Sequence, residues 1–271
     1  MKISILFVLS ALLLTSCMSD SQLKEKMKKA IKEDPSIITI AMEEKPVEFM
    51  EAFQKALEKA RAGMAKKKAE EERKRIEDTY NNPFKPAVEG RVFFGKDDAP
   101  LTLVEYSDFE CPYCEMGFQR VQELMKKYDG KIKFVYKHFP LNFHKCAMPS
   151  ASFYEAIALQ DKSKAAKFHD KVFAQFRKLS SLCRGDLDSG LKFLKKVAKS
   201  VGANVSKMEK DSKSDVIRKK IMGDMEEAQK FGINGTPGFI LNGVPVPGGA
   251  APIERFEEVI SELKKRGKLN I

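Results

Sequence analysis

The chain has 271 residues, of which 43% are apolar and 32% are charged, and it carries a formal net charge of +11. This composition supplies enough apolar side chains for one sizeable domain with an appendage, or for two small domains, and it excludes a mainly disordered chain. There are five cysteines, and because five is odd, at least one thiol must differ in role from the others.

Residues 1–16 have the pattern of a secretory signal, in which one lysine precedes an apolar run from Ile3 to Leu14 that is short for a bilayer span. The run ends in the sequence LTSC, which resembles a bacterial lipobox. This predicts a lipoprotein signal peptide over residues 1–16 and lipidation of Cys17. The alternative is an ordinary signal peptide cleaved near Ser16, with Cys17 an incidental thiol. Either signal predicts a location at the periplasmic or extracytoplasmic face of a bacterial cell envelope, where disulfides persist.

Residues 17–87 are predicted to form a helical arm that ends in a charged spacer helix. Pro35 and Pro46 mark the starts of two helices, because proline is favoured in the first helical turn. The helix after Pro46 carries apolar residues at alternating spacings of three and four, which is a heptad seam over about two repeats. The seam either packs on the domain that follows or, as we prefer, joins copies of the chain in a homo-oligomer through residues 21–64. It consists of Met50, Phe53, Leu57, Ala60 and Met64.

The spacer covers residues 65–78, where apolar side chains nearly vanish and basic side chains face glutamates four residues away. Such pairs support a solvated helix by about 0.2–0.5 kcal/mol each, so this stretch is not a core element. Pro83 and Pro86 then break the helix. We expect the domain boundary there, with a second domain over residues 88–271.

The second domain is predicted to be α/β, because strand and helix signals alternate along it. Its last strand contains Pro245, which is typical of a sheet edge. The expected elements are strands at 101–106 and 131–137, a helix at 112–128 between them, a helical insertion at about 146–230, a strand pair at 239–246 and a terminal helix at 252–266.

The positive charge is concentrated between Asp161 and Lys230, where 18 basic residues stand against 10 acidic ones. Nucleic-acid binding could use such a surface, but these basic residues alternate with acids at helical spacing and lack aromatic partners. We therefore expect a solvated helical face and no nucleic-acid partner.

The chemistry is predicted to lie in a C-x-x-C pair, Cys111 and Cys114, at a strand-to-helix junction. A cysteine at a helix N-terminus has a stabilised thiolate, with a pKa of roughly 3.5–7.5 at such sites. The second cysteine lies one turn further along, where it is more buried and less acidic. The pair is thus expected to contain an attacking sulfur and a resolving sulfur.

Two alternatives for this pair are a structural disulfide and a zinc site. Zinc would need two more ligands, for which His138, His144 and Cys146 are candidates, but no second C-x-x-C is present. Attachment of a c-type haem is excluded because Glu115 follows the second cysteine. We expect no metal and no cofactor. The histidines otherwise have the pattern of ordinary surface or half-buried residues.

The sequence FECPYC at 109–114, followed by GTPGF at 235–239, resembles the DsbA-like branch of the thioredoxin superfamily over roughly residues 90–271. The N-terminal helices and the Pro-Tyr dipeptide also resemble the oligomeric disulfide isomerases of the ScsC and DsbC type. The resemblance implies a thioredoxin-like fold with a helical insertion. It implies a thiol–disulfide oxidoreductase, either isomerase or oxidase, that acts on exported cysteine-containing proteins, is recharged by a membrane redox partner and needs no cofactor beyond its redox-active disulfide.

The resemblance also assigns roles to single residues. Pro237 matches the cis-proline of the family, and with Thr236, Pro112 and Tyr113 it is expected to bind substrate. Glu105 matches a buried acid that assists proton transfer at the resolving thiol; its alternative is an edge carboxylate in solvent.

Cys146 and Cys183 match a second, structural disulfide that some relatives carry. The alternative is that one of the two is a further reactive thiol. For the whole protein, the alternative to an enzyme is an oligomeric surface lipoprotein or chaperone that uses a thioredoxin-like domain for binding only.

Overall fold

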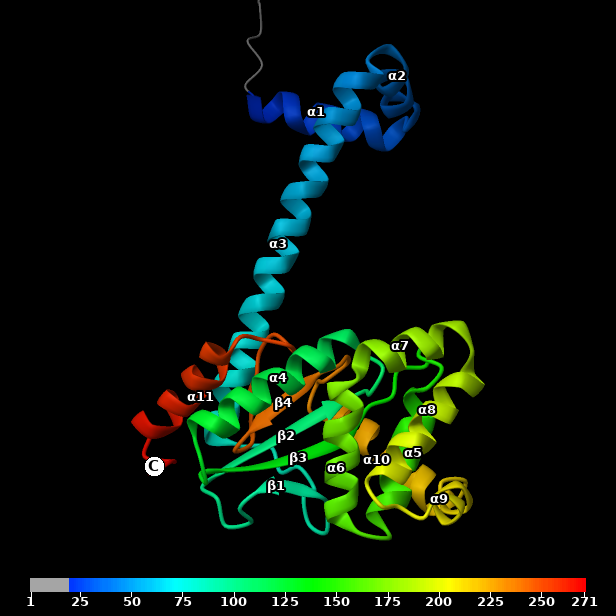
Figure 1. Cartoon of the computed structure of the whole chain (residues 1–271). Coiled ribbons are helices and arrows are strands. Elements are labelled where there is room, and N and C mark those ends of the chain that lie inside the picture. Colours follow the sequence, from blue (N-terminus) through cyan, green and yellow to red (C-terminus); the bar gives the residue numbers. More distant parts are fainter. Residues whose placement is uncertain (1–19) are drawn as a thin grey trace, which may run out of the picture. The chain divides into compact units, whose positions relative to one another are not determined.

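The computed structural model describes residues 20–271, and the chain divides into two compact units, Met1–Glu71 and Glu72–Ile271 (Figure 1). The predicted signal peptide over residues 1–16 and the predicted lipidation site Cys17 lie outside the described residues. Among the helices of residues 20–271, none has the length and apolar character required to cross a bilayer.

The first unit is helical, as the sequence predicts. It contains α1 (Asp20–Glu33), α2 (Ser36–Glu44) and the beginning of α3 (Pro46–Asn81). The carboxylate of Asp34 accepts a hydrogen bond of 3.0 Å from the backbone N–H of Ser36, which satisfies one of the free amides at the start of α2. Helix α3 has 36 residues and ends directly before Asn82 and Pro83.

Apolar side chains of the first unit are exposed in the single chain. The seam residues Met50, Phe53, Leu57 and Met64 expose 38–65% of their surface. The rings of Phe49 and Phe53 stack with centroids 6.3 Å apart, but they leave most of the seam uncovered. This exposure is compatible with the predicted homo-oligomer, which stays a prediction.

The second unit is built around a five-stranded sheet with the strand order β1-β3-β2-β4-β5. Strands β2 and β3 are parallel, and the other pairs are antiparallel. The predicted α/β fold is confirmed, with Pro245 in an edge strand. Strand β1 is an addition that the sequence did not predict, because three residues are too few to show a period. The strands are β1 (Phe93–Gly95), β2 (Leu101–Ser107), β3 (Ile132–His138), β4 (Gly238–Leu241) and β5 (Val244–Val246).

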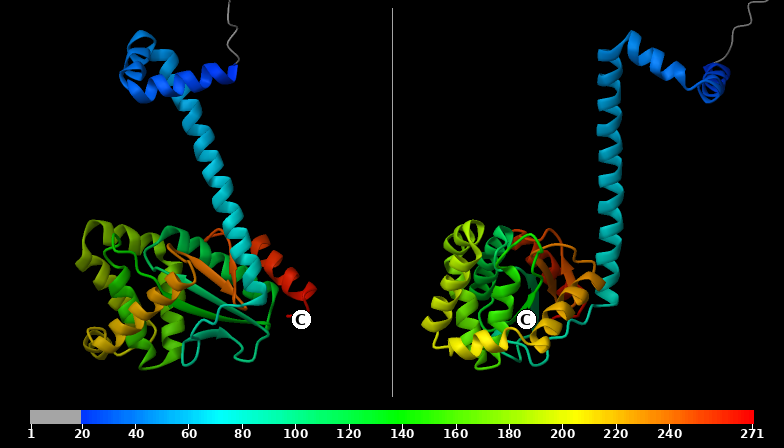
Figure 2. Two further views of the ribbon diagram at one scale, coloured as in Figure 1. Left: turned by 180° about the vertical axis from the view of Figure 1, so that it is seen from behind. Right: turned by 90° about the vertical axis from the view of Figure 1, so that its right-hand side faces the viewer.

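Alternate residues of β2 enter apolar cores on opposite faces of the sheet. Leu103 points to the face covered by α4 (Pro112–Lys127) and α11 (Ile253–Lys265), where Phe239 packs edge-on against Phe256. Val104 points to the other face, which is covered by α10 (Asp215–Lys230) (Figure 2). Strand β2 is the central strand, and its C-terminal end leads into α4. The C-x-x-C pair therefore lies just beyond the C-terminal end of the central strand, between the helices that cover the two faces of the sheet.

The helical insertion between β3 and β4 contains six helices. Cys146 caps α5 and Cys183 lies in the last turn of α7, and the two form a disulfide with a Cα–Cα distance of 5.9 Å. This is the second disulfide that the resemblance implied. Neither cysteine is therefore a free thiol. The helices are α5 (Ala147–Ala158), α6 (Lys162–Ala174), α7 (Phe176–Gly185), α8 (Leu187–Ser200), α9 (Val205–Asp211) and α10.

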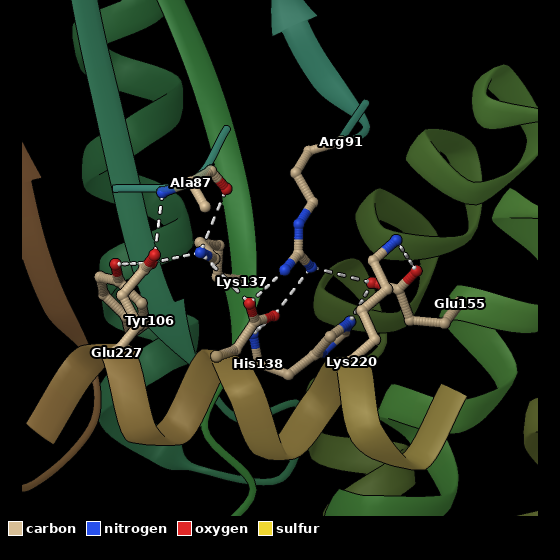
Figure 3. A network of polar contacts seen from close by, with 9 residues as sticks. Ala87, Arg91, Tyr106, Lys137, His138, Glu155, Lys220 and Glu227 are labelled. Atoms are coloured by element: carbon tan, nitrogen blue, oxygen red, sulfur yellow. Dashed lines mark hydrogen bonds and ion pairs between the residues drawn. The ribbon is translucent and has the colours of Figure 1, made fainter. Parts of the chain in front are cut away.

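A network of buried charges joins α10 to the sheet (Figure 3). The Lys137 side chain, 1% exposed, forms ion pairs with Asp224 at 3.2 Å and with Glu227. Arg91 forms a two-pronged pair with Asp224, one arm at 2.9 Å. The Tyr106 hydroxyl donates to Glu227. Each carboxylate is thus held by at least two donors, which a buried charge needs to offset its lost hydration.

The same network extends to α5. Glu155 accepts hydrogen bonds from Lys220 at 2.6 Å and Arg91 at 3.5 Å, and it lies 3.1 Å from Nε2 of His138. Burial by itself would raise the pKa of Glu155, but His138 and Lys220 outweigh it and lower the pKa to about 2. The fully buried position of His138, like that of His169, departs from the surface or half-buried position expected for the histidines.

Candidate active site

Cys111 is the N-cap residue of α4, and Pro112 takes the first helical position. The first turn of a helix leaves its amide N–H groups without intrahelical partners, so an anion is favoured at this point. The sulfur of Cys111 lies 3.6 Å from the carbonyl oxygen of Thr236, in the loop that precedes β4. The two motifs that are far apart in the sequence therefore meet at this sulfur.

The two thiols of the pair are present as free cysteines with opposite properties. The hydrogen bond from Cys114 has the largest effect on Cys111 and lowers its pKa to about 6, against the opposing effect of burial. The backbone N–H groups of Tyr113 and Cys114 act in the same direction. For Cys114, burial and the neighbouring Cys111 raise the pKa well above the ordinary value. A thiolate at Cys111 beside a protonated Cys114 is the asymmetry required of an attacking and a resolving sulfur.

This asymmetry gives a prediction for chemical modification of the reduced protein. The thiolate is the reactive form, so a pKa lowered to about 6 makes Cys111 reactive at lower pH than an ordinary cysteine. We expect its alkylation rate to rise with pH through about 6, while Cys114 stays unmodified at neutral pH. Rates with iodoacetamide, followed by mass spectrometry of the peptide that carries both cysteines, would measure this. A Cys111 midpoint near the ordinary value of about 8.5 would contradict it.

Glu105 lies beneath α4, on the central strand β2, and is 1% exposed. A Cβ atom on Gly117 of α4 would lie 3.3 Å from Oε1 of Glu105, so the helix approaches the carboxyl closely because this position has no side chain. Burial raises the pKa of Glu105 to about 8, although a hydrogen bond from Ser107 at 2.7 Å opposes the rise. Among the residues from 20 onward, no group forms a hydrogen bond with the other carboxyl oxygen, Oε2. The alternative of a solvent-exposed edge carboxylate is therefore excluded.

Ser107 connects this acid to the resolving thiol. Its hydroxyl donates a hydrogen bond to Glu105 and also forms a hydrogen bond with Cys114. Burial, Cys111 and Glu105 raise the pKa of Cys114, and the hydrogen bond with Ser107 lowers it. A proton that leaves Cys114 has a short path through the hydroxyl to the carboxylate. Sequence reasoning did not find Ser107. It lies two residues after Glu105 on β2, and this spacing places both side chains on the same face of the strand, so the pair could have been predicted.

We predict that Glu105→Gln slows the attack of Cys114 on a mixed disulfide by about 100-fold, the order expected for loss of a proton acceptor. The base form of Glu105 grows with pH through about 8, so the wild-type rate should rise in that range and the rise should disappear in the variant. Stopped-flow resolution of the Cys111–glutathione disulfide would measure both effects. Glu123→Gln, an exposed carboxylate on α4, is the matched control. Equal pH profiles for the wild type and Glu105→Gln would contradict the role.

A second polar cluster fixes the loop before Cys111, and sequence reasoning missed it. The carboxylate of Asp108, 2% exposed, accepts hydrogen bonds from the backbone N–H groups of Glu110 and Leu141 and lies 2.7 Å from Nδ1 of His144. The pair with Asp108 raises the pKa of His144. Glu110 in turn accepts a hydrogen bond of 2.7 Å from the backbone of Cys146. The active-site loop is thus tied to the start of the helical insertion.

The expected substrate-binding residues fall into two groups. Tyr113, Thr236 and Pro237 line one cavity of about 450 Å³, next to glycines 248 and 249. The Thr236–Pro237 peptide bond is cis, as the resemblance implied, and the Tyr113 ring is 61% exposed. Pro112 instead lines a second cavity on the side of α7.

The zinc alternative finds no support among the side chains that were its candidates. Cys146 is in a disulfide, and the rings of His138 and His144 are held by Glu155 and Asp108 respectively. In residues 20–271, one group of side chains has metal-binding spacing, but it comprises Glu110 and the two cysteines of the disulfide, whose sulfurs are not available as thiolate ligands.

Comparison with known proteins agrees with this geometry. A family model described as thioredoxin matches residues 87–262. The chain belongs to the thioredoxin family. Probable disulfide bond formation protein D of Bacillus cereus is 32% identical over 152 residues, which cover 55% of this chain and 68% of that protein. The predicted fold and the predicted membership of the DsbA-like thiol–disulfide oxidoreductases are confirmed.

Other relatives share only part of their length or only their fold. The Na⁺/H⁺ antiporter NhaA 1 of Mycolicibacterium vanbaalenii is 30% identical over 153 residues, but the chain spans 23% of that protein. BdbD of Bacillus subtilis superposes with a TM-score of 0.57 at 24% identity, covering 68% of this chain and 97% of BdbD. Proteus mirabilis ScsC has a TM-score of 0.52 at 21% identity and covers 90% of this chain and 98% of ScsC. At these identities the two structures show a shared fold.

Proposed function

We propose that this protein is an envelope thiol–disulfide oxidoreductase in which Cys111 forms the mixed disulfide with an exported client and Cys114 resolves it. The observation that carries the proposal is the opposite character of the two thiols, a pKa of about 6 at the helix N-terminus and a strongly raised pKa at the buried partner. Glu105 accepts, through the hydroxyl of Ser107, the proton that Cys114 gives up, and the cavity at Thr236 and Pro237 holds the client chain.

The direction we favour is isomerisation by a homo-oligomer. The Pro-Tyr dipeptide and Thr236 resemble the isomerase branch, and the exposed seam of α3 supplies a surface through which residues 21–64 could bring several active sites together. In this proposal residues 17–87 are the oligomerisation arm and residues 88–271 the catalytic domain. A membrane redox partner keeps Cys111 and Cys114 in the reduced state that isomerisation requires.

Oxidation is the second candidate, and the Cys111 pKa favours it. A stabilised thiolate stabilises the reduced form of the pair, which makes the disulfide a stronger oxidant. Incubating the purified protein with a scrambled client and, separately, with a reduced client distinguishes the two. The isomerase reshuffles the first in its reduced form, whereas the oxidase introduces disulfides into the second in its oxidised form. Activity in neither assay would refute the proposed function and favour a binding module or chaperone.

The oligomer has its own test in the full-length protein. Phe53→Asp with Leu57→Asp should convert it to a monomer by light scattering, because two charges enter the apolar seam. Lys55→Asp with Lys59→Asp places the same side chains on the other face of α3 and should leave the mass unchanged. An unchanged mass in the first variant would refute the role of the seam.

For location, we propose that Cys17 carries a lipid anchor that holds the protein at the periplasmic or extracytoplasmic face of the envelope. Incorporation of labelled fatty acid into the wild type, and its loss in Cys17→Ala, is the expected result. Labelling that persists in Cys17→Ala would refute the anchor site.

A further inference from the structure

A second cavity adjoins the active site at Pro112 and shares no lining residue with the cavity at Thr236 and Pro237. Its volume is about 480 Å³. Pro112, the residue after Cys111, forms part of its wall, so a client joined to Cys111 reaches this cavity within a few residues of its own cysteine. The remaining wall is formed by Glu110, His144 and one face of α7, including Phe176, Arg177 and Arg184.

The charge of this cavity is positive at its mouth. Arg177 and Arg184 are exposed, and neither guanidinium has a hydrogen bond or ion pair within residues 20–271. The Lys145 ammonium is close by, donating to the backbone oxygen of Arg184 at 3.3 Å. His144, whose pKa is raised by its pair with Asp108, also lines the cavity.

The acidic groups nearby are already engaged inside the protein. Glu110 is the acidic residue of the wall; it is 5% exposed, and its carboxylate accepts from the backbone of Cys146. Burial raises the pKa of Glu110. Asp108 is fully engaged by His144 and two backbone N–H groups. Asp186, beyond the end of α7, accepts from the backbone of residues 188 and 189. Within residues 20–271, neither arginine forms an ion pair with any of these carboxylates.

The arginines are also held in place. They are seven residues apart on α7, which is two helical turns and puts them on one face of the helix. Cys183, beside Arg184, is bonded to Cys146, and Cys146 is hydrogen-bonded to Glu110, next to Cys111. The disulfide thus fixes the cationic face of α7 relative to the reactive sulfur. A preformed cationic site loses less entropy on binding than a flexible one.

We infer that this cavity is a client subsite that binds the carboxylate of an aspartate or glutamate close to the client's reactive cysteine. The inference rests on the proposed function, in which a client chain is held at Cys111. Clients with acidic residues near a cysteine are then preferred over clients with basic ones, and the preference resides in Arg177 and Arg184.

The test uses the reduced full-length protein and two peptides that differ only in glutamate or lysine flanking one cysteine. Each cysteine is capped as a mixed disulfide with thionitrobenzoate. The Cys111 thiolate attacks the peptide sulfur, one S–S bond forms between Cys111 and the peptide, and the bond to thionitrobenzoate breaks to release that coloured thiolate. Each rate is divided by the rate of the same peptide with 2-mercaptoethanol, a thiol without other charged groups, which removes differences in intrinsic reactivity.

We expect the glutamate peptide to react about 5- to 10-fold faster than the lysine peptide at low ionic strength, with the ratio approaching one in high salt. Arg177→Glu with Arg184→Glu should reduce the ratio to one or invert it. Arg218→Glu, an exposed arginine of α10 outside the cavity, should keep it. Because the result is a ratio, a general change in the Cys111 pKa does not affect it.

Three outcomes would overturn the inference. Equal wild-type rates with both peptides refute the subsite while leaving the proposed function intact. No reaction with either peptide refutes the subsite and the proposed function together. Glutathione disulfide carries carboxylates too; if charge reversal slows it, relative to uncharged hydroxyethyl disulfide, by the same factor as the glutamate peptide, the site serves a small acidic thiol rather than a client.

Discussion

Replacing Cys111 with serine is expected to abolish thiol–disulfide exchange, whereas Cys114→Ser is expected to stop the reaction at the mixed disulfide. Cys111 is the sulfur with a pKa of about 6, and it lies at the helix N-terminus beside the Thr236 loop. Cys114 is fully buried and protonated, so it cannot replace Cys111 as the attacking group. A serine hydroxyl at position 111 forms no disulfide.

The two variants are distinguishable in one experiment. Incubation of each with a disulfide-containing client, followed by acid quenching and non-reducing electrophoresis, should give an accumulated covalent complex only for Cys114→Ser. Cys146→Ala with Cys183→Ala removes cysteines away from the reacting sulfur and should retain exchange. A covalent complex formed by Cys111→Ser would contradict the assignment of roles.

The residues that were predictable from the sequence belong to local patterns. The strand over 101–106, the helix from Pro112 and the pair Cys111 and Cys114 follow one another, so their placement depends on a few adjacent residues. The sheet edge at Pro245 was predictable for the same reason, because proline lacks the N–H that an inner strand needs. The meeting of Cys111 with Pro237 came instead from a resemblance, since 126 positions separate them in the sequence.

The features that were missed depend on contacts between distant segments. Asp108 and His144 are 36 residues apart, and nothing local to either one indicates a pair. Strand β1 is defined by its pairing with β3 rather than by a pattern of its own. The buried histidines also follow from tertiary structure: His138 is accommodated in the interior because Glu155, from another helix, lies against its ring.

The buried network of charges between α10 and the sheet also depends on contacts between distant segments. Its loss gives the largest change in stability that we predict. Lys137→Met should destabilise the second unit by about 3 kcal/mol or more, because it preserves side-chain length but removes the ammonium that pairs with both Asp224 and Glu227. Breaking a buried pair leaves an uncompensated charge, which costs roughly 3–5 kcal/mol. Arg91 still neutralises Asp224, so the loss falls mainly on Glu227.

Lys133→Met is the matched control, on the same strand and the same face. Lys133 pairs with Asp97, whose side chain is 71% exposed, and exposed pairs contribute only about 0–1 kcal/mol. Urea unfolding followed by tyrosine fluorescence reports on the second unit alone, because the chain has no tryptophan and its six tyrosines all follow residue 71. Adding Glu227→Gln to Lys137→Met should restore part of the loss, since the stranded charge disappears. Equal destabilisation by Lys137→Met and Lys133→Met would show that the buried network contributes no more than a surface pair.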